Sequence, residues 1–180
     1  MKIQEAGKYT YGHDSFEHIN LKGGEITIGN FCAIASGVKM YTGRGDHRKE
    51  FISTYPFGNI HTHVFPNGDA ASLINTIDCW DVHIGHDVWI GQGVTIMPGV
   101  TIGSGSMIAA RSHVVKSCEP YSIIGGNPST LIKKRFTDTQ IEELMKIEWW
   151  LWDDKKINDN IPYISSNNID TFIELHKQSS

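Results

Sequence analysis

The sequence predicts an all-β solenoid, in which short parallel strands coil around a narrow core, and two observations lead to this fold class. Aliphatic residues recur at every sixth position over much of the chain, and glycine accounts for 18 of the 180 residues. The period is clearest from residue 84, where the aliphatic positions are Ile84, Ile90, Ile96, Ile102, Ile108 and Val114. The same register occurs earlier, at Ile28, Ile34 and Met40. Self-similarity at a fixed short period is typical of a solenoid.

The six-residue spacing fits a short strand followed by a turn. In an α-helix, apolar residues at this spacing would spiral around the whole surface. Four residues after each aliphatic position comes a small or β-branched residue: Val88, Val94, Val100, Ser106, Ser112 and Cys118. We expect both positions to face inward and Gly, Asn or Asp to occupy the turns. Three strands then complete a coil of about 18 residues, and coils stack by parallel hydrogen bonding. An ordinary β-sandwich is the less favoured alternative.

The repeat stops over residues 41–76, which we interpret as a loop excursion from the solenoid. This stretch is rich in Gly, His, Asn, Thr and aromatic residues. Loops of such length are either functional or disordered, and the aromatic residues favour an ordered excursion. The repeat resumes at Ile77 or Ile84 and fades near Ile132. We therefore assign residues 1–136 to one β-helix domain that carries the excursion.

Residues 137–180 have a different pattern, which predicts helices. Thr137 and Gln140 have the spacing of a capping box at a helix start. Further short helices are expected over 153–161 and 169–176. We expect this segment to cover the open end of the solenoid as a helical cap, because the last coil otherwise exposes strand edges and core. Three tryptophans are candidates for this packing: Trp149, Trp150 and Trp152.

Composition and charge exclude several classes of protein. Hydrophobic residues make up 39% and charged residues 20%, as is ordinary for a folded domain. The net charge of −4 argues against nucleic acid as a partner, because phosphate binding needs a concentrated basic surface. No apolar run approaches the roughly 18 residues of a membrane helix, and the start lacks the apolar core of a signal peptide. We therefore expect no membrane span and a cytoplasmic location.

Several motifs resemble those of the hexapeptide-repeat acyltransferases. The resemblance extends over residues 24–152 and includes IGHDVWIGQGVTIMPGVTIGSGSMIAARSHVV, PYSIIGGNPSTLIKKRF and EWWLW. The segment GDHRKEFISTYPF is similar to the signature of the xenobiotic acetyltransferase branch, which includes chloramphenicol and streptogramin acetyltransferases and related sugar acetyltransferases. The resemblance implies a left-handed parallel β-helix, a homotrimer, acetyl-CoA as donor, and active sites between neighbouring subunits.

Acetyl transfer requires a base that takes the acceptor's proton, and histidine suits this role near neutral pH. His47 lies at the mouth of the excursion, in Gly-Asp-His-Arg. By resemblance it occupies the position of the family's catalytic histidine, so we expect it to be the general base. Tyr41, Tyr55 and Trp89 are the candidates for contact with the acceptor, with packing as the alternative for Trp89.

The resemblance also implies a donor site along the outside of the solenoid. Ala110 corresponds to an alanine that contacts the cofactor, and Lys116 to a lysine near its nucleotide. A basic cluster follows the GGNP turn and suits the phosphates of coenzyme A: Lys133, Lys134 and Arg135. For each cation taken alone, a solvated surface position is the alternative.

Cysteine and metal chemistry are less favoured. The three cysteines are widely spaced and build neither a disulfide framework nor a CxxC zinc site. Cys32 and Cys118 fall at inward-facing positions, which favours direct attack of the acceptor on acetyl-CoA over a covalent cysteine route, whereas Cys79 is harder to place. His61 and His63 have metal-ligand spacing, but no third ligand is evident, so we predict no functional metal.

We expect the acceptor to be a sugar or sugar nucleotide, acetylated at a hydroxyl or an amine. The segment GNIHTHVFPNGD replaces the Trp- and acid-bearing loop of the antibiotic-modifying enzymes, and the N-terminal lead-in is shorter than theirs. An antibiotic of the chloramphenicol or streptogramin type is the second candidate. More distant alternatives are a non-catalytic trimeric scaffold and a metal-dependent solenoid hydratase.

Overall fold

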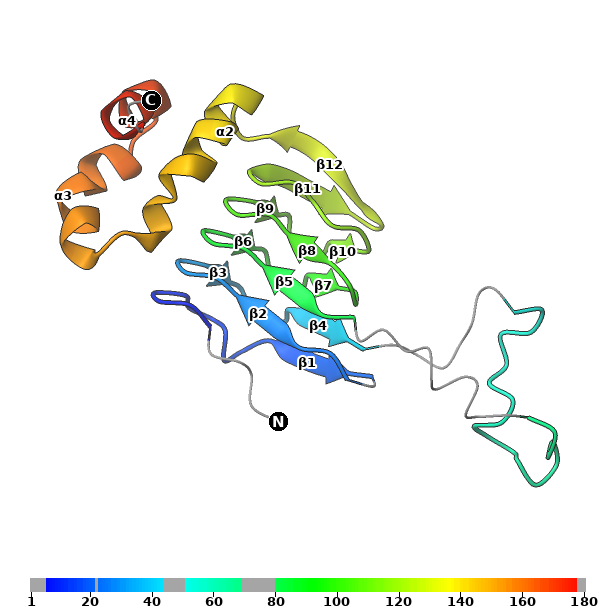
Figure 1. The fold of residues 1–180 in the computed structure, drawn as a ribbon. Coiled ribbons are helices and arrows are strands. Elements are labelled where there is room, and N and C mark those ends of the chain that lie inside the picture. Colours follow the sequence, from blue (N-terminus) through cyan, green and yellow to red (C-terminus); the bar gives the residue numbers. More distant parts are fainter. Residues whose placement is uncertain (1–5, 22, 44–50, 69–79, 178–180) are drawn as a thin grey trace.

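A computed structural model describes residues 6–21, 23–43, 51–68 and 80–177 and shows a stack of triangular coils with helices at one side (Figure 1). The strands form three sheets, one on each face of the stack. The first sheet contains β1 (Glu17–Asn20), β4 (Lys39–Thr42), β7 (Thr95–Ile96) and β10 (His113–Val114). The second contains β12 (Ser129–Lys134), β11 (Ser122–Gly126), β9 (Met107–Ile108), β6 (Trp89–Ile90) and β3 (Ala33–Ile34). The third contains β2 (Ile26–Ile28), β5 (Val82–Ile84) and β8 (Thr101–Ile102).

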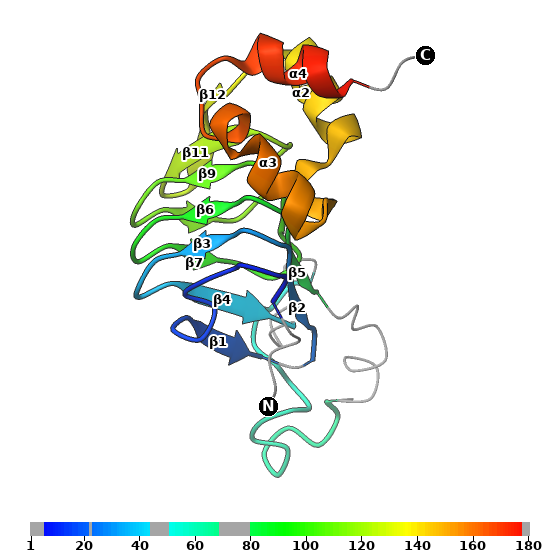
Figure 2. The same cartoon turned by 90° about the vertical axis from the view of Figure 1, so that its left-hand side faces the viewer.

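Strands of successive coils pair in parallel, as the six-residue period predicts. Ile84 pairs with Ile102, and Ile90 with Ile108, so partners in the regular coils lie 18 residues apart. Across the excursion, Ile28 pairs with Ile84, 56 residues further on. The excursion therefore lengthens one coil without changing the register of the stack. Figure 2 shows β11, β9, β6 and β3 lying one above another.

The inward-facing positions build the core of the solenoid. The six aliphatic positions from Ile84 to Val114 are at most 3% exposed. The positions four residues later are also buried, except Cys118, which is half-buried. Two of these positions carry serines whose hydroxyls donate to backbone carbonyls, Ser106 to Glu119 and Ser112 to Ala109, so they are not left unsatisfied. The expectation that both positions face inward is confirmed.

A turn residue with a positive φ angle lies three residues after each aliphatic position except Val114. Glycine occupies most of these turns: Gly37, Gly43, Gly93, Gly99 and Gly105. Asp87 occupies another turn, as expected for a residue that tolerates this conformation. Phe31 and Arg111 adopt it with φ of 60° and 61°, so the expectation of only Gly, Asn or Asp is wrong at these two turns.

The last coil ends in an antiparallel hairpin of β11 and β12, with its turn at Asn127 and Pro128. Three helices and a short 3-10 helix follow: α2 (Asp138–Ile147), η1 (Trp149–Leu151), α3 (Asp154–Ile164) and α4 (Ile169–His176). The capping box of Thr137 and Gln140 is confirmed, since each side chain bonds the other residue's backbone N–H. None of the helices among the described residues is long and apolar enough to cross a membrane.

The helices pack through a second apolar cluster, separate from the core of the solenoid. Its buried members are Tyr121, Ile141, Leu144, Ile147, Trp150 and Phe172. The Asn30 side chain donates to the carbonyl of Trp150 at 2.9 Å, which ties the helices to an early coil. The helices lie beside the ends of β3, β6 and β9 (Figure 1), and their role as a cap over the open end stays a prediction.

The described part of the excursion, residues 51–68, projects from the solenoid on the side away from the helices (Figure 1). Aromatic rings gather within it, with Tyr55 and Phe57 at 4.7 Å and Phe57 and Phe65 at 5.2 Å between centroids. Seven large hydrophobic side chains of this segment are exposed: Phe51, Ile52, Tyr55, Phe57, Ile60, Val64 and Phe65.

Candidate active site

The segment expected to carry the general base leaves the solenoid at the end of β4. His47 and Cys79 lie outside the described residues, so the role of His47 stays a prediction. The two ends of the excursion are joined, because the Gly43 N–H donates to the Trp80 carbonyl at 3.1 Å. Glycine is required nearby, since a Cβ on Gly24 would lie 2.8 Å from Gly43 N. These contacts fix where the excursion begins and ends.

Thr42 lies at this root, is fully buried, and shares a 2.8 Å hydrogen bond with Nε2 of His18. Burial lowers the pKa of His18 below its ordinary value. His18 is not among the residues predicted from sequence to act at the site, and it lies 24 positions away from Thr42. The pairing of β1 with β4 brings the two together, and the six-residue period carries no signal for this contact.

The three candidate acceptor-binding residues do not meet within one chain. Tyr41 is half-buried on β4, in the first sheet, whereas Trp89 is on β6 in the second sheet and is 52% exposed. Tyr55 belongs to the projecting excursion, where its hydroxyl shares a 2.5 Å hydrogen bond with Nδ1 of His61. Two different faces of the solenoid and a projecting loop therefore carry these side chains.

A groove of about 420 Å³ brings together two of the candidate donor-binding residues, Lys116 and Lys134. It lies between the segment 115–119 and the β11–β12 hairpin. Its apolar wall and its hydroxyl groups come from Val115, Ile124, Pro128, Leu131, Ser117, Ser122, Ser129 and Thr130. Such a mixture of apolar walls, hydroxyl groups and cations suits an elongated anionic ligand.

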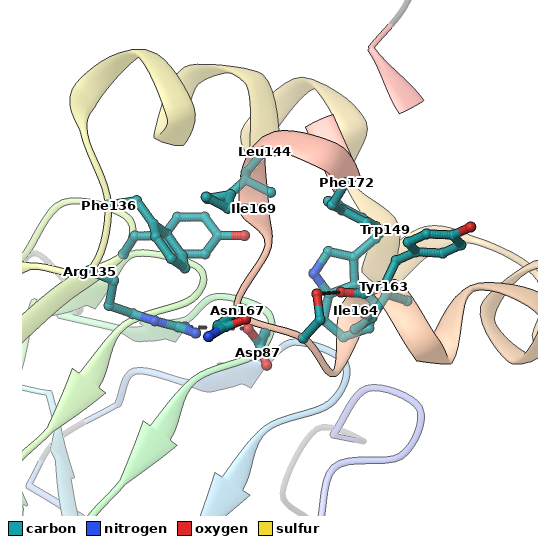
Figure 3. Close-up of a pocket in the computed structure, with 12 residues that line it drawn as sticks. Asp87, Arg135, Phe136, Leu144, Trp149, Tyr163, Ile164, Asn167, Ile169 and Phe172 are labelled. Atoms are coloured by element: carbon teal, nitrogen blue, oxygen red, sulfur yellow. Dashed lines mark hydrogen bonds and ion pairs between the residues drawn. The ribbon is translucent and has the colours of Figure 1, made fainter. Parts of the chain in front are cut away.

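The three cations of the expected basic cluster lie in different surroundings in the structure. Lys134 lines the groove and forms an ion pair with Asp138, which raises the pKa of Lys134. Lys133 is exposed and does not line the groove. Arg135 points elsewhere, toward a cavity of about 210 Å³ between the solenoid and the helices (Figure 3). The assignment of the three cations to the phosphates of coenzyme A stays a prediction.

Ala110 lies at the turn that follows β9, an interior strand of the second sheet, and is exposed. The backbone of the preceding coil approaches closely here, since a Cβ on Gly91 would lie 2.6 Å from Ala110 N. Ala110 thus follows a strand of the sheet that also carries Trp89, and it does not line the groove of Lys116 and Lys134.

The thiols do not suit nucleophilic attack. Cys32 is fully buried, and burial raises its pKa to about 11. Burial also raises the pKa of Cys118. A reactive cysteine needs a lowered pKa and access to substrate. Within the described ranges no group of three or more His, Cys, Asp or Glu side chains is placed to hold a metal ion.

The fold and the groove define a class of protein, the transferases built from hexapeptide repeats. Residues 81–116 match the family described as bacterial transferase hexapeptide (six repeats). The chain is 49% identical to a probable macrolide acetyltransferase from Lysinibacillus sphaericus, over 86% of this chain and 85% of that protein. It is 40% identical to a chloramphenicol acetyltransferase from Klebsiella aerogenes, over 85% of this chain and 70% of the relative.

A solved structure supports the same assignment. A hexapeptide-repeat acetyltransferase from Vibrio cholerae, in complex with acetyl coenzyme A, superimposes with a TM-score of 0.50 and 27% identity. The match covers 73% of this chain and 60% of that one, so this chain spans less than two thirds of the Vibrio chain. The chain belongs to the hexapeptide-repeat acetyltransferases, in the branch that includes the antibiotic-modifying enzymes.

Proposed function

We propose that this protein transfers the acetyl group of acetyl-CoA to a hydroxyl group of an antibiotic, with a macrolide as the first candidate acceptor. The observation that carries the proposal is the 49% identity to a probable macrolide acetyltransferase along 85% of that relative. This reverses the order expected from sequence, in which a sugar came before an antibiotic. Acetyl-CoA is the donor, as expected.

The chemistry of residues 51–68, the described part of the excursion, supports a large, mostly apolar acceptor. Residues 51–68 contain no Asp, Glu, Lys or Arg, and they expose aromatic and aliphatic side chains. Such a surface can bury the apolar ring of a macrolide. Within residues 51–68 no Lys or Arg is present to make charge-assisted hydrogen bonds to the diphosphate of a sugar nucleotide, and the cations of the excursion, Arg44, Arg48 and Lys49, precede this segment.

The donor is assigned to the groove beside the β11–β12 hairpin. Lys116 and Lys134 would bind phosphate oxygens, while the apolar and hydroxyl-bearing walls would hold the pantetheine arm. Ala110 and Lys133 lie outside this groove, so we assign them at most an outer contact with the donor.

His47 is the proposed general base in a direct transfer. Its imidazole takes the proton of the acceptor hydroxyl while the oxygen attacks the thioester carbonyl carbon. The tetrahedral intermediate then collapses, the C–S bond breaks, and the imidazolium returns the proton to the thiolate of coenzyme A. A covalent acetyl-cysteine step is disfavoured by the burial and raised pKa of Cys32.

A homotrimer of left-handed β-helices, with active sites between subunits, is the proposed assembly. The excursion and the donor groove lie at different parts of one chain (Figure 1), so a second copy is needed to bring them together. The outward-facing row of the second sheet is apolar and suits a subunit contact: Ala33, Trp89, Met107 and Ile123. The outward rows of the other two sheets are polar, with Thr27, His83 and Thr101 on one and Lys39, Thr95 and His113 on the other.

The experiment is release of free thiol from acetyl-CoA in the presence of a macrolide, chloramphenicol, a streptogramin, a simple sugar or an amino-sugar nucleotide. We expect release with the macrolide and acetylation of one of its hydroxyl groups, identified by mass spectrometry. Release with a sugar alone would reject the antibiotic acceptor and restore the sugar. Failure of the protein to bind acetyl-CoA would reject the donor assignment.

A further inference from the structure

Arg135 makes contacts that differ from those of the two lysines that precede it. Its Nη1 donates to the Gly105 carbonyl at 2.6 Å and lies 3.6 Å from Oδ2 of Asp87. Its guanidinium also lies 5.3 Å from the ring centroids of Tyr121 and Phe136. From these contacts we infer that Arg135 and Asp87 are positioning residues, which hold the end of β12 so that Lys134 faces the donor groove. The inference rests on the donor site proposed above.

The contacts of Arg135 join β12 to a rigid corner of the solenoid. Asp87 and Gly105 occupy the same turn in two successive coils, and the Gly105 N–H donates to the His86 carbonyl at 2.7 Å. The backbone N–H of Arg135 donates to the Tyr121 carbonyl at 2.8 Å. One residue therefore connects the end of β12 to three turns at one corner.

The sequence at this corner supports a specific role for Asp87. At this corner the neighbouring coils carry Phe31 and Gly105 in the equivalent turns, and Asp87 adopts a φ of 53° between them. A side chain in this conformation costs about 1 kcal/mol. The carboxylate at Asp87 is directed toward Arg135 at the polar end of the cavity (Figure 3).

Strand β12 needs such an anchor because it lies at the edge of its sheet. It pairs with β11 alone, and the register of that pairing shifts between Ile123 and Ile124, opposite Lys133 and Leu131. Lys134 is the last residue of the strand and lines the groove, while Arg135 follows directly and turns to the opposite side. The anchor at Arg135 therefore fixes the backbone of the residue that faces the groove.

The alternative role for Arg135 is direct binding of the donor's phosphates. The variant Asp87→Asn distinguishes the two roles, because they predict changes of opposite sign in the Kd of acetyl-CoA. If Arg135 is a phosphate ligand, this change frees its guanidinium and removes a negative charge near a polyanion, so acetyl-CoA binds more tightly. If Arg135 positions β12, the same change weakens the anchor and acetyl-CoA binds less tightly. Asn is nearly isosteric with Asp and tolerates positive φ, so the fold is retained.

The test measures the Kd of acetyl-CoA by calorimetry, together with KM and kcat. For Asp87→Asn and Arg135→Lys we expect Kd and KM to rise about tenfold, with kcat changed by less than about twofold. The double variant Asp87→Asn/Lys134→Ala should bind no more weakly than Lys134→Ala, because the two changes affect one interaction. Phe172→Leu is the matched control: it loosens the same helical packing without touching the pair, and should lower Tm while leaving Kd unchanged.

An unchanged or lower Kd in Asp87→Asn would overturn the positioning role. The positioning role would also be overturned if the effects of Asp87→Asn and Lys134→Ala on Kd were fully additive in the double variant. It would be overturned as well if Phe172→Leu raised Kd as much as Asp87→Asn does. A wild-type protein that binds no acetyl-CoA would reject the proposed donor site instead, so the two failures are distinguishable.

Discussion

The imidazole ring of His86 stacks on the indole ring of Trp150, with centroids 5.5 Å apart and planes inclined by 6°. Nδ1 of His86 accepts a 2.9 Å hydrogen bond from the backbone N–H of Asn30, and the Asn30 side chain in turn donates to the Trp150 carbonyl. His86 must be neutral at Nδ1 to accept this bond. The attachment of the helices to the solenoid therefore depends on an uncharged histidine.

Stability should decrease in mild acid. Burial lowers the pKa of His86 in the folded protein, so the unfolded chain takes up a proton first as pH falls below about 6.5. The free energy of unfolding is then highest above this pH and decreases below it, until the folded form is also protonated. His18 and His176, whose pKa values burial also lowers, contribute in the same direction.

Denaturant unfolding at pH 7.5 and 5.5 measures this effect. His86→Asn, which keeps an acceptor but cannot titrate in this range, should reduce the loss of stability between the two pH values. An equal loss in the variant and the wild type would assign the pH dependence to other groups.

The side chains at the inward-facing positions should contribute most to the free energy of unfolding. Ile102 is fully buried, whereas its neighbour Thr101 is exposed on the same strand. Ile102→Ala should lower the free energy of unfolding by about 2–5 kcal/mol. Thr101→Ala is the matched control and should cost less than about 1 kcal/mol. Similar losses for the two variants, measured by urea unfolding, would contradict the inward assignment.

Two turn glycines should differ in their tolerance of alanine. Both Gly93 and Gly105 have positive φ, but a Cβ on Gly105 would lie 2.5 Å from the Tyr121 ring, whereas on Gly93 its nearest neighbour is Cγ of Arg111 at 3.7 Å. Gly93→Ala should cost about 1 kcal/mol from backbone strain. Gly105→Ala should cost about 1–3 kcal/mol more from overpacking. Thermal unfolding of the two variants measures the two costs in stability. Equal costs would contradict the close approach of the Tyr121 ring to Gly105.

Much of the solenoid is predictable because its residues act through local, repeated chemistry. Ile96 and Val94 follow a fixed inward alternation, and each turn falls at a fixed position. The direction of Arg135 was not predictable, because it depends on the Gly105 carbonyl 30 positions away and on a buried corner. The hydrogen bond from Asn30 to Trp150 was equally unpredictable, because it joins residues 120 positions apart. The repeat predicts the strands, but the attachment of the helices depends on individual long-range contacts.

The two lysines next to Arg135 should contribute unequally to donor binding. Lys134 lines the groove with Lys116, whereas Lys133 does not. Lys116→Ala and Lys134→Ala should each raise the Kd of acetyl-CoA about tenfold, as expected for a charge-assisted hydrogen bond to phosphate. Lys133→Ala is the matched control, with a change of less than about twofold. A larger effect at Lys133 than at Lys134 would move the phosphate site to the other side of β12.

The role of His47 is tested most directly by comparing thiol release by the wild-type protein and by His47→Ala, with acetyl-CoA and a macrolide acceptor. We expect the variant to bind acetyl-CoA as the wild type does but to lose a factor of about 10²–10⁴ in kcat, because the acceptor hydroxyl has no base. Equal rates in the two proteins would remove His47 from the mechanism. The absence of any macrolide-dependent release from the wild type would contradict the proposed acceptor.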